Sequence, residues 1–199
     1  MKDIIMRIVN ESRKVKECFI QKNASKLIHL AEYVANTFNN NGKIMLCGNG
    51  GSAADAQHIA AEFVNRFQFE RPPLPALALT TDTSILTSVA NDYGYEEIFS
   101  RQIKALGMKE DILLAISTSG RSKNVISAIK TAKKKGLYTV SFIGGDGGEV
   151  LKLVDLALTV ESENTPRVQE VHILAGHILC ELVERILFSK ISLKDNIQD

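Results

Sequence analysis

The stretch from Ile44 to Glu62 reads Ile-Met-Leu-Cys-Gly-Asn-Gly-Gly-Ser-Ala-Ala-Asp-Ala-Gln-His-Ile-Ala-Ala-Glu and joins an apolar segment to a helical one. Its first three residues predict a short buried strand. The glycines at positions 48, 50 and 51 allow a sharp turn and a close approach of the backbone to a ligand. We expect Ser52 to cap a helix that runs to about Phe67, with Asp55 as its capping-box partner. A glycine turn that leads into a helix N-terminus is typical of an anion site, most often a phosphate site.

Two reactive side chains lie farther along the same predicted helix. His58 and Glu62 are spaced i, i+4, so both project from one helix face. The neighbours of Glu62 are mostly apolar, which favours a position in a cleft. A carboxylate in such surroundings tends to have a raised pKa, which suits a general base. An anion site and two reactive side chains on one helix predict chemistry on a phosphorylated molecule.

The length of the chain fits one α/β domain with a well-filled core, and two small domains are the alternative. The chain has 199 residues, and its 24 Lys and Arg nearly balance its 23 Asp and Glu, so we expect no nucleic-acid or membrane-surface partner. Cys18, Cys47 and Cys180 are widely spaced in apolar surroundings, which predicts reduced thiols and neither a disulfide framework nor a zinc knuckle. The sequence has neither the apolar core of a signal peptide nor a run long enough to span a bilayer. We therefore expect a cytoplasmic protein.

Strands and helices are expected to alternate along most of the chain. Apolar residues at helical spacing predict an N-terminal helical hairpin over residues 1–41, with helices at 2–22 and 24–39, before an α/β core at 42–190. Further helices are expected at 84–90, 97–106, 122–135 and 166–189. Buried strands are expected at 44–46, 76–79, 112–116, 138–143 and 156–160. This alternation predicts a single domain with a doubly wound, mainly parallel sheet and right-handed crossovers.

A second loop, Ser117-Thr118-Ser119-Gly120-Arg121-Ser122, directly follows one of the predicted strands. Hydroxyl groups and helix-terminal N–H groups bind a phosphate monoester without a buried cation. A serine-rich helix cap would have the same composition. The position after an apolar strand, together with the earlier glycine turn, favours a sugar-phosphate site.

The last predicted helix carries Gln169, His172 and His177. Most single histidines on helices are structural or exposed, but His177 lies in an apolar stretch, which favours a buried or cleft position. Gln169 and His177 are eight residues apart, or ~12 Å along a helix. A metal ion shared by both would require the two side chains to lean toward each other.

The glycine turn also fits the dinucleotide-binding pattern G-x-G-x-x-G/A from Gly48 to Ala53. That pattern requires an acidic residue about 20 positions later to hold a ribose. The chain has Gln68 and Phe69 there, and Asp82 lies too far along. An oxidoreductase that uses a nicotinamide or flavin is therefore the weaker alternative.

In combination, five motifs resemble the sugar isomerase (SIS) family, and more narrowly its phosphoheptose isomerases. They are Gly48–Ser52, His58 with Glu62, Asn91-Asp92, Ser117–Ser122, and Arg167–Glu170 with His177. The resemblance covers nearly the whole chain and implies a flavodoxin-like α-β-α sandwich that forms a homotetramer with active sites between subunits. The implied reaction converts D-sedoheptulose 7-phosphate into D-glycero-D-manno-heptose 7-phosphate through an enediol. This is the first step of bacterial heptose biosynthesis, which supplies lipopolysaccharide, capsule or surface-layer glycans.

The resemblance also implies roles for individual residues. Glu62 and His177 form the proton-transfer pair, and either residue can be the one that transfers the carbon-bound proton. The implied phosphate ligands are Ser117, Thr118, Ser119 and Ser122. The other implied substrate-binding residues are Asn49, Gly50, Gly51, Ser52, Asn91, Asp92 and Gln169. One Zn²⁺ per subunit is implied, with the ligands His58, Glu62, Gln169 and His177. Zinc or hydrogen-bond donors would stabilise the enediolate oxygen.

A second group within the same fold is also similar to this chain. Asn65-Arg66-Phe67, Glu70-Arg71-Pro72 and Leu74-Pro75-Ala76 resemble non-catalytic SIS relatives that bind the bacterial replication initiator. Those relatives lack the glutamate and the final histidine at the matching positions. Because Glu62 and His177 are both present here, the sequence favours the enzyme, with a tetrameric initiator-binding module as the alternative.

Overall fold

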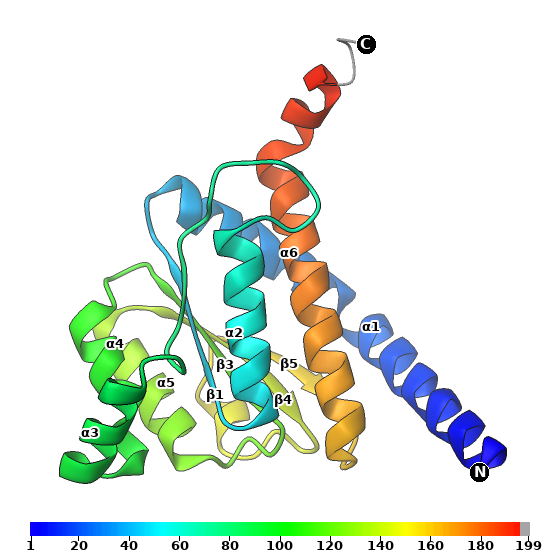
Figure 1. The fold of residues 1–199 in the computed structure, drawn as a ribbon, viewed down its shortest axis with the longest axis horizontal. Coiled ribbons are helices and arrows are strands. Elements are labelled where there is room, and N and C mark those ends of the chain that lie inside the picture. The colour runs from blue at the N-terminus through cyan, green and yellow to red at the C-terminus, as the bar shows by residue number, and fades with distance from the viewer. Residues whose placement is uncertain (196–199) are drawn as a thin grey trace.

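The computed structural model describes residues 1–195, and their side chains as far as residue 188. A five-stranded parallel sheet lies between two layers of helices (Figure 1). The strands are β1 Ile44–Gly48, β2 Ala76–Ala78, β3 Ile112–Ser117, β4 Tyr138–Gly144 and β5 Leu156–Val160. Their spatial order, β2-β1-β3-β4-β5, is the flavodoxin-like order. The predicted doubly wound α/β class is confirmed.

The helices cover both faces of the sheet. They are α1 Lys2–Asn39, α2 Gly51–Val64, α3 Thr83–Tyr93, α4 Ser100–Leu106, α5 Lys123–Lys135 and α6 Thr165–Asp195, with 3₁₀ turns at Tyr95–Glu97 and Val150–Lys152. Because successive strand residues point to opposite faces, Ile44 of β1 packs into a core with α1, α2 and α6, while its neighbour Met45 packs into a second core with α4 and α5. No helix in the described part of the chain combines the length and the apolar character needed to cross a membrane.

The predicted N-terminal hairpin is wrong, because residues 2–39 form one continuous helix (Figure 1). The division was expected at Asn23, but no glycine or proline interrupts the backbone there. Asn23 is buried, and its Nδ2 donates to the carbonyl of Phe19 at 3.0 Å and to that of Thr159 in β5 at 3.5 Å. These bonds, one within the helix and one to β5, satisfy the amide, so the polar residue does not end the helix.

The start and the end of α2 also differ from the prediction. The N-cap residue is Gly50, with φ 55°, and no side chain caps the helix. Ser52 is buried inside the first turn, and Oδ2 of Asp55 is buried without a hydrogen-bond partner among the described residues, so the expected capping box does not form. The helix ends at Val64 instead of near Phe67, because the chain then turns toward α6.

The topology places both predicted phosphate loops at one point. β1 pairs with β2 on one side and with β3 on the other, so the strand order reverses between β1 and β3. Ligands of open α/β sheets bind beyond the carboxyl ends of the strands at such a switch point. The glycine turn follows β1 and the serine-rich loop follows β3.

The three cysteines are free thiols, as predicted. Cys47 and Cys180 are buried and Cys18 is half-buried.

Candidate active site

A pair of side-chain amides joins the glycine turn to the first turn of α5, directly after the serine-rich loop. Nδ2 of Asn49 donates to Oδ1 of Asn124 at 2.9 Å, and Nδ2 of Asn124 donates to Oδ1 of Asn49 at 2.8 Å. The hydroxyl of Tyr95 donates to the same Asn49 oxygen at 3.0 Å. The glycine turn, the start of α5 and the segment after α3 therefore meet at Asn49.

The hydroxyl groups of the serine-rich loop lie at the start of α5, and those of Ser117 and Ser119 also accept backbone N–H groups of the loop. Ser122 is the N-cap residue of α5, but its side chain makes no capping bond. Its Oγ lies 3.5 Å from the Oγ of Ser117, which accepts the backbone N–H of Gly120 at 3.1 Å. Ser119 is exposed. A helix N-terminus beside hydroxyls of this kind is a ready anion site.

A cavity of about 310 Å³ opens beside this loop. Arg121, at its edge, forms a two-pronged ion pair with Asp146, at 2.9 and 2.6 Å. The guanidinium is thus engaged within the fold, which agrees with its having no predicted ligand role. The cavity is lined by Thr118, Ser119, Arg121, Gly144, Gly145, Asp146, Ser162, Glu163, Thr165 and Val168.

Helices α2 and α6 lie side by side, and two glycines allow their close approach (Figure 1). A Cβ added at Gly176 of α6 would lie 2.5 Å from Cδ1 of Ile59 in α2. A Cβ at Gly51 would overlap the side-chain amide of Gln169. The first turns of both helices therefore meet at Gly51, and His58 and His177 meet farther along.

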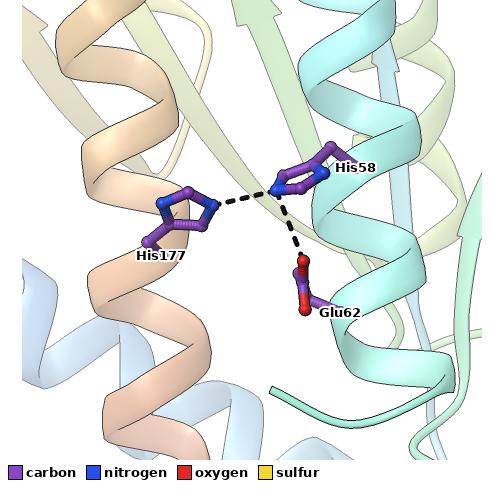
Figure 2. Close-up of side chains that lie close together, drawn as sticks. All are labelled: His58, Glu62 and His177. Atoms are coloured by element: carbon purple, nitrogen blue, oxygen red, sulfur yellow. Dashed lines mark hydrogen bonds and ion pairs between the residues drawn. The ribbon is translucent and has the colours of Figure 1, made fainter. Parts of the chain in front are cut away.

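Figure 2 shows His58 and Glu62 of α2 and His177 of α6 converging on one point. Nε2 of His58 lies 2.9 Å from Nε2 of His177 and 3.3 Å from Oε1 of Glu62. One ligand atom from each residue lies within 4.8 Å of the other two. The side chain of His58 is 47% exposed and that of Glu62 is 23% exposed, so the cluster is open to solvent on one side. Two imidazoles and a carboxylate can exchange protons with a bound molecule or hold a metal ion.

The structure brings only some of the predicted site residues together. Asn91 and Asp92 lie exposed in the last turn of α3, where Nδ2 of Asn91 donates to Oδ1 of Asp92 at 2.8 Å. Among the described side chains, no hydrogen bond or ion pair connects the serine-rich loop with His58, Glu62 or His177. The candidate site within one chain therefore has two parts, an anion-binding part at the switch point and a reactive part on α2 and α6.

Several residues near these two parts were not predicted. Asn124 and Tyr95 organise the switch point, and Phe67 stacks on His177 with ring centroids 5.6 Å apart. The position of Asn124 in the first turn of the helix after Ser122 was the sequence feature that could have indicated its role. The roles of Tyr95 and Phe67 depend on long-range contacts that leave no local pattern.

Comparison with known proteins identifies the family. The profile of the SIS domain matches residues 9–144. A phosphoheptose isomerase from Thermodesulfovibrio yellowstonii is 56% identical over 188 residues, which cover 94% of each chain. This chain belongs to the phosphoheptose isomerase family of SIS-domain proteins. A second family member, from Nitratidesulfovibrio vulgaris, is 53% identical over 190 residues, which cover 96% of this chain and 91% of the relative.

The fold of a solved member of the phosphoheptose isomerase family agrees with this structure. The enzyme from Neisseria gonorrhoeae superposes with a TM-score of 0.87 at 40% identity, and the match covers 92% of this chain and 98% of that one. These similarities favour the enzyme over both alternatives raised by the sequence, the initiator-binding module and the dinucleotide-dependent oxidoreductase.

Proposed function

We propose that this protein is an aldose–ketose isomerase that converts D-sedoheptulose 7-phosphate into D-glycero-D-manno-heptose 7-phosphate. The observation that carries the proposal is the convergence of Glu62 and His177 with His58 in one partly exposed cluster. The three relatives compared above are all named as phosphoheptose isomerases, which supports the choice of substrate.

The phosphate of the substrate binds at the switch point. Its ligands are the hydroxyls and N–H groups of Ser117, Thr118, Ser119 and Ser122. The Ser122 side chain lies at the start of α5 and makes no capping bond, which supports this assignment. Gly50 and Gly51 let the backbone approach the sugar. The sugar hydroxyls are bound by Asn49, Asn91, Asp92 and Gln169, whereas the predicted ligand Ser52 is buried in the first turn of α2.

Glu62 and His177 carry out the proton transfers. The reaction moves a proton between C1 and C2 through an enediol. One group must therefore transfer the carbon-bound proton, and another must transfer the proton of the hydroxyl oxygens. The two side chains come from different helices and face one point, so they can act on neighbouring atoms of one substrate.

A zinc ion fits the three clustered residues. Two imidazole nitrogens and a carboxylate oxygen are ligands that Zn²⁺ accepts, and one such atom from each residue lies within 4.8 Å of the other two. Bound there, zinc would supply a positive charge for the enediolate oxygen. His58, Glu62 and His177 would hold it, and Gln169 stays a prediction as the fourth ligand. Zinc titration of chelator-treated protein, with His58→Gln as the comparison, tests this binding without an activity assay.

Replacement of Glu62 with Gln tests the mechanism. The amide keeps the shape of the side chain but cannot take up a proton, so we expect kcat to fall by about 10²–10⁴-fold while substrate still binds. Conversion of sedoheptulose 7-phosphate to the aldose phosphate gives the rates. Glu149→Gln, which changes an exposed glutamate paired with Lys130, is the control.

Two results would count against the proposal. A Glu62→Gln rate close to that of the unchanged protein would remove Glu62 from the mechanism. Absence of turnover by the unchanged protein, with and without added zinc, would end the isomerase assignment.

We further propose that the protein acts as a homotetramer in the cytoplasm. The first half of α1 extends beyond the body of the subunit (Figure 1) and exposes apolar side chains that a second chain can cover. Assembly can also bring residues of a second chain to the site, because no hydrogen bond or ion pair joins its two parts among the described side chains of one chain. Free thiols support a reducing compartment.

A further inference from the structure

A buried ion pair joins the loop after α2 to α6. Nε of Arg71 donates to Oε1 of Glu184 at 2.7 Å, and the two side chains are 0% and 1% exposed. The Glu184 oxygens also accept the backbone N–H groups of Phe67 and Gln68 at 2.8 Å and of Phe69 at 3.1 Å. Burial acts to raise the pKa of Glu184, but these N–H groups and Arg71 outweigh it and hold the pKa below its ordinary value. The carboxylate is therefore charged and fully bonded.

The other side of the Arg71 guanidinium holds the end of α2. Nη2 donates to the carbonyl of Glu62 at 2.8 Å, and Nη1 donates to that of Phe63 at 2.9 Å. Carbonyls in the last turn of a helix have no partner within the helix, and a cation there also interacts favourably with the helix dipole. Arg71 thus fixes the backbone of the residue that carries the candidate catalytic carboxylate.

Glu184 reaches the second candidate catalytic residue through Phe67. The loop after α2 passes over the end of that helix and alongside α6 (Figure 1). Glu184 binds the N–H of Phe67, and the Phe67 ring stacks on the ring of His177 with an interplanar angle of 28°. Arg71 therefore bonds the Glu62 carbonyl directly, and Glu184 is connected to the His177 ring through Phe67.

We propose that Arg71 and Glu184 are positioning residues of the active site, and that they set the separation of Glu62 and His177 through the α2 terminus and Phe67. This inference rests on the proposed isomerase function. Neither side chain is exposed to a ligand, so both act through other residues. A misplacement of catalytic groups by about 1 Å can lower the rate 10²-fold, which makes the ion pair a determinant of kcat as well as of folding.

The test compares Glu184→Gln and Arg71→Lys with a matched control. Lysine keeps the charge of Arg71 but cannot bond the carboxylate and two carbonyls at once. The control is Asp111→Asn, because Asp111 is also a buried carboxylate, accepting N–H groups of Lys43 and Met108 and the ammonium of Lys43, but it contacts no residue of the site. All variants are assayed with sedoheptulose 7-phosphate well below their melting temperatures, with folding checked by circular dichroism.

We expect all three variants to melt at lower temperatures, but only the two ion-pair variants to lose activity. Their kcat should fall about tenfold or more with KM changed little. The control should keep its kcat within about twofold. Equal kcat values for the ion-pair variants and the control, at equal folded fraction, would overturn the positioning role.

A second readout is independent of turnover. The Phe67 ring shifts the NMR signals of the His177 ring by its ring current, and we expect this shift to shrink in Glu184→Gln, in Arg71→Lys and in Phe67→Leu, but not in Asp111→Asn. The spectra are recorded with a chelator present, and His177→Gln assigns the signals. Phe67→Leu has no aromatic ring, so it gives the position of the His177 signals without the stack, against which the ion-pair variants are compared. Either ion-pair variant carries the test if the other does not fold.

These readouts separate the two proposals. An inactive wild-type protein with the expected NMR changes would reject the isomerase function and keep the positioning of His177. An active protein whose His177 signals are unchanged in all ion-pair variants would reject the positioning role alone.

Discussion

At the scale of single residues, His172 is a buried histidine that the proposed chemistry does not use. It lies in α6 against Phe142 of β4, with no exposed surface, and neither ring nitrogen has a hydrogen-bond partner among the described residues. Burial lowers the pKa of His172 from 6.5 to about 4, although the backbone of Ile143 acts in the opposite direction. Folding therefore selects the neutral ring.

This shift predicts a loss of stability in mild acid. The folded-state pKa lies below the unfolded value, so the stability from His172 is fully present above pH 6.5 and is lost as the pH falls toward 4. The loss amounts to at most about 3 kcal/mol. Urea unfolding between pH 7.5 and pH 4 measures it, and His172→Leu should show a shallower decline than the unchanged protein. Parallel declines would assign the acid sensitivity to other groups.

At the scale of elements, the contact between α2 and α6 controls the reactive cluster. Gly176 precedes His177, and an added Cβ there would lie 2.5 and 2.7 Å from Cδ1 and Cγ1 of Ile59. Alanine favours a helix by about 1 kcal/mol over glycine, but overpacking costs about 1–3 kcal/mol. The cost of overpacking should exceed the gain in helix propensity and push α2 and α6 apart.

We therefore expect Gly176→Ala to lower both the free energy of unfolding, by about 1 kcal/mol, and the isomerase activity. Ile59→Val removes the Cδ1 methyl group, so the double variant Ile59→Val/Gly176→Ala should recover part of both losses. Urea unfolding and the isomerase assay provide the two measurements. A single variant that is as stable and as active as the unchanged protein would show that Ile59 moves aside without consequence.

The elements themselves were largely predictable because their sequence patterns are local. Parallel strands buried on both faces read as continuous apolar runs, and β5 was predicted at its observed bounds, Leu156–Val160. The hairpin prediction failed at Asn23 because its amide is satisfied within the helix and by Thr159, a residue 136 positions away. Local patterns contain no information about such a partner.

The candidate site also has residues that local spacing predicts and residues that only long-range contacts bring together. His58 and Glu62 were predicted to share a helix face from their spacing alone, and the structure brings them to one point with His177. The Arg71–Glu184 pair joins residues 113 positions apart and was not predicted. Each of these two residues is charged, and a charged residue read from sequence is assigned to the surface unless its partner is known.

At the scale of the whole molecule, α1 has two different halves. Its second half packs into the core through residues such as Leu27, Leu30 and Val34. Its first half and the preceding Met1 expose large apolar side chains, each at least 41% accessible: Met1, Ile4, Ile5, Met6, Ile8 and Val9. Several large apolar side chains exposed on one helix segment are typical of an interface, and a second copy of the same helix is an available partner for self-association.

Charge placed on this half of α1 should therefore dissociate the assembly. We expect the unchanged protein to have about four times the 21.9 kDa mass of one chain by light scattering after gel filtration. Ile5→Glu/Ile8→Glu should have a smaller mass, because two carboxylates cannot be buried in the interface without a large penalty. Met108→Glu, at a site 70% exposed outside α1, is the control and should keep the mass.

Activity measured on the same samples links assembly to the site. The cluster of His58, Glu62 and His177 forms within one chain, so dissociation alone should leave the NMR signals of the His177 ring unchanged. If the anion-binding part and the reactive part of one active site come from different chains, the dissociated variant should lose turnover with its cluster intact. Full activity of the dissociated variant would show that one chain holds the complete site, and an unchanged mass would show that the subunits associate through another surface.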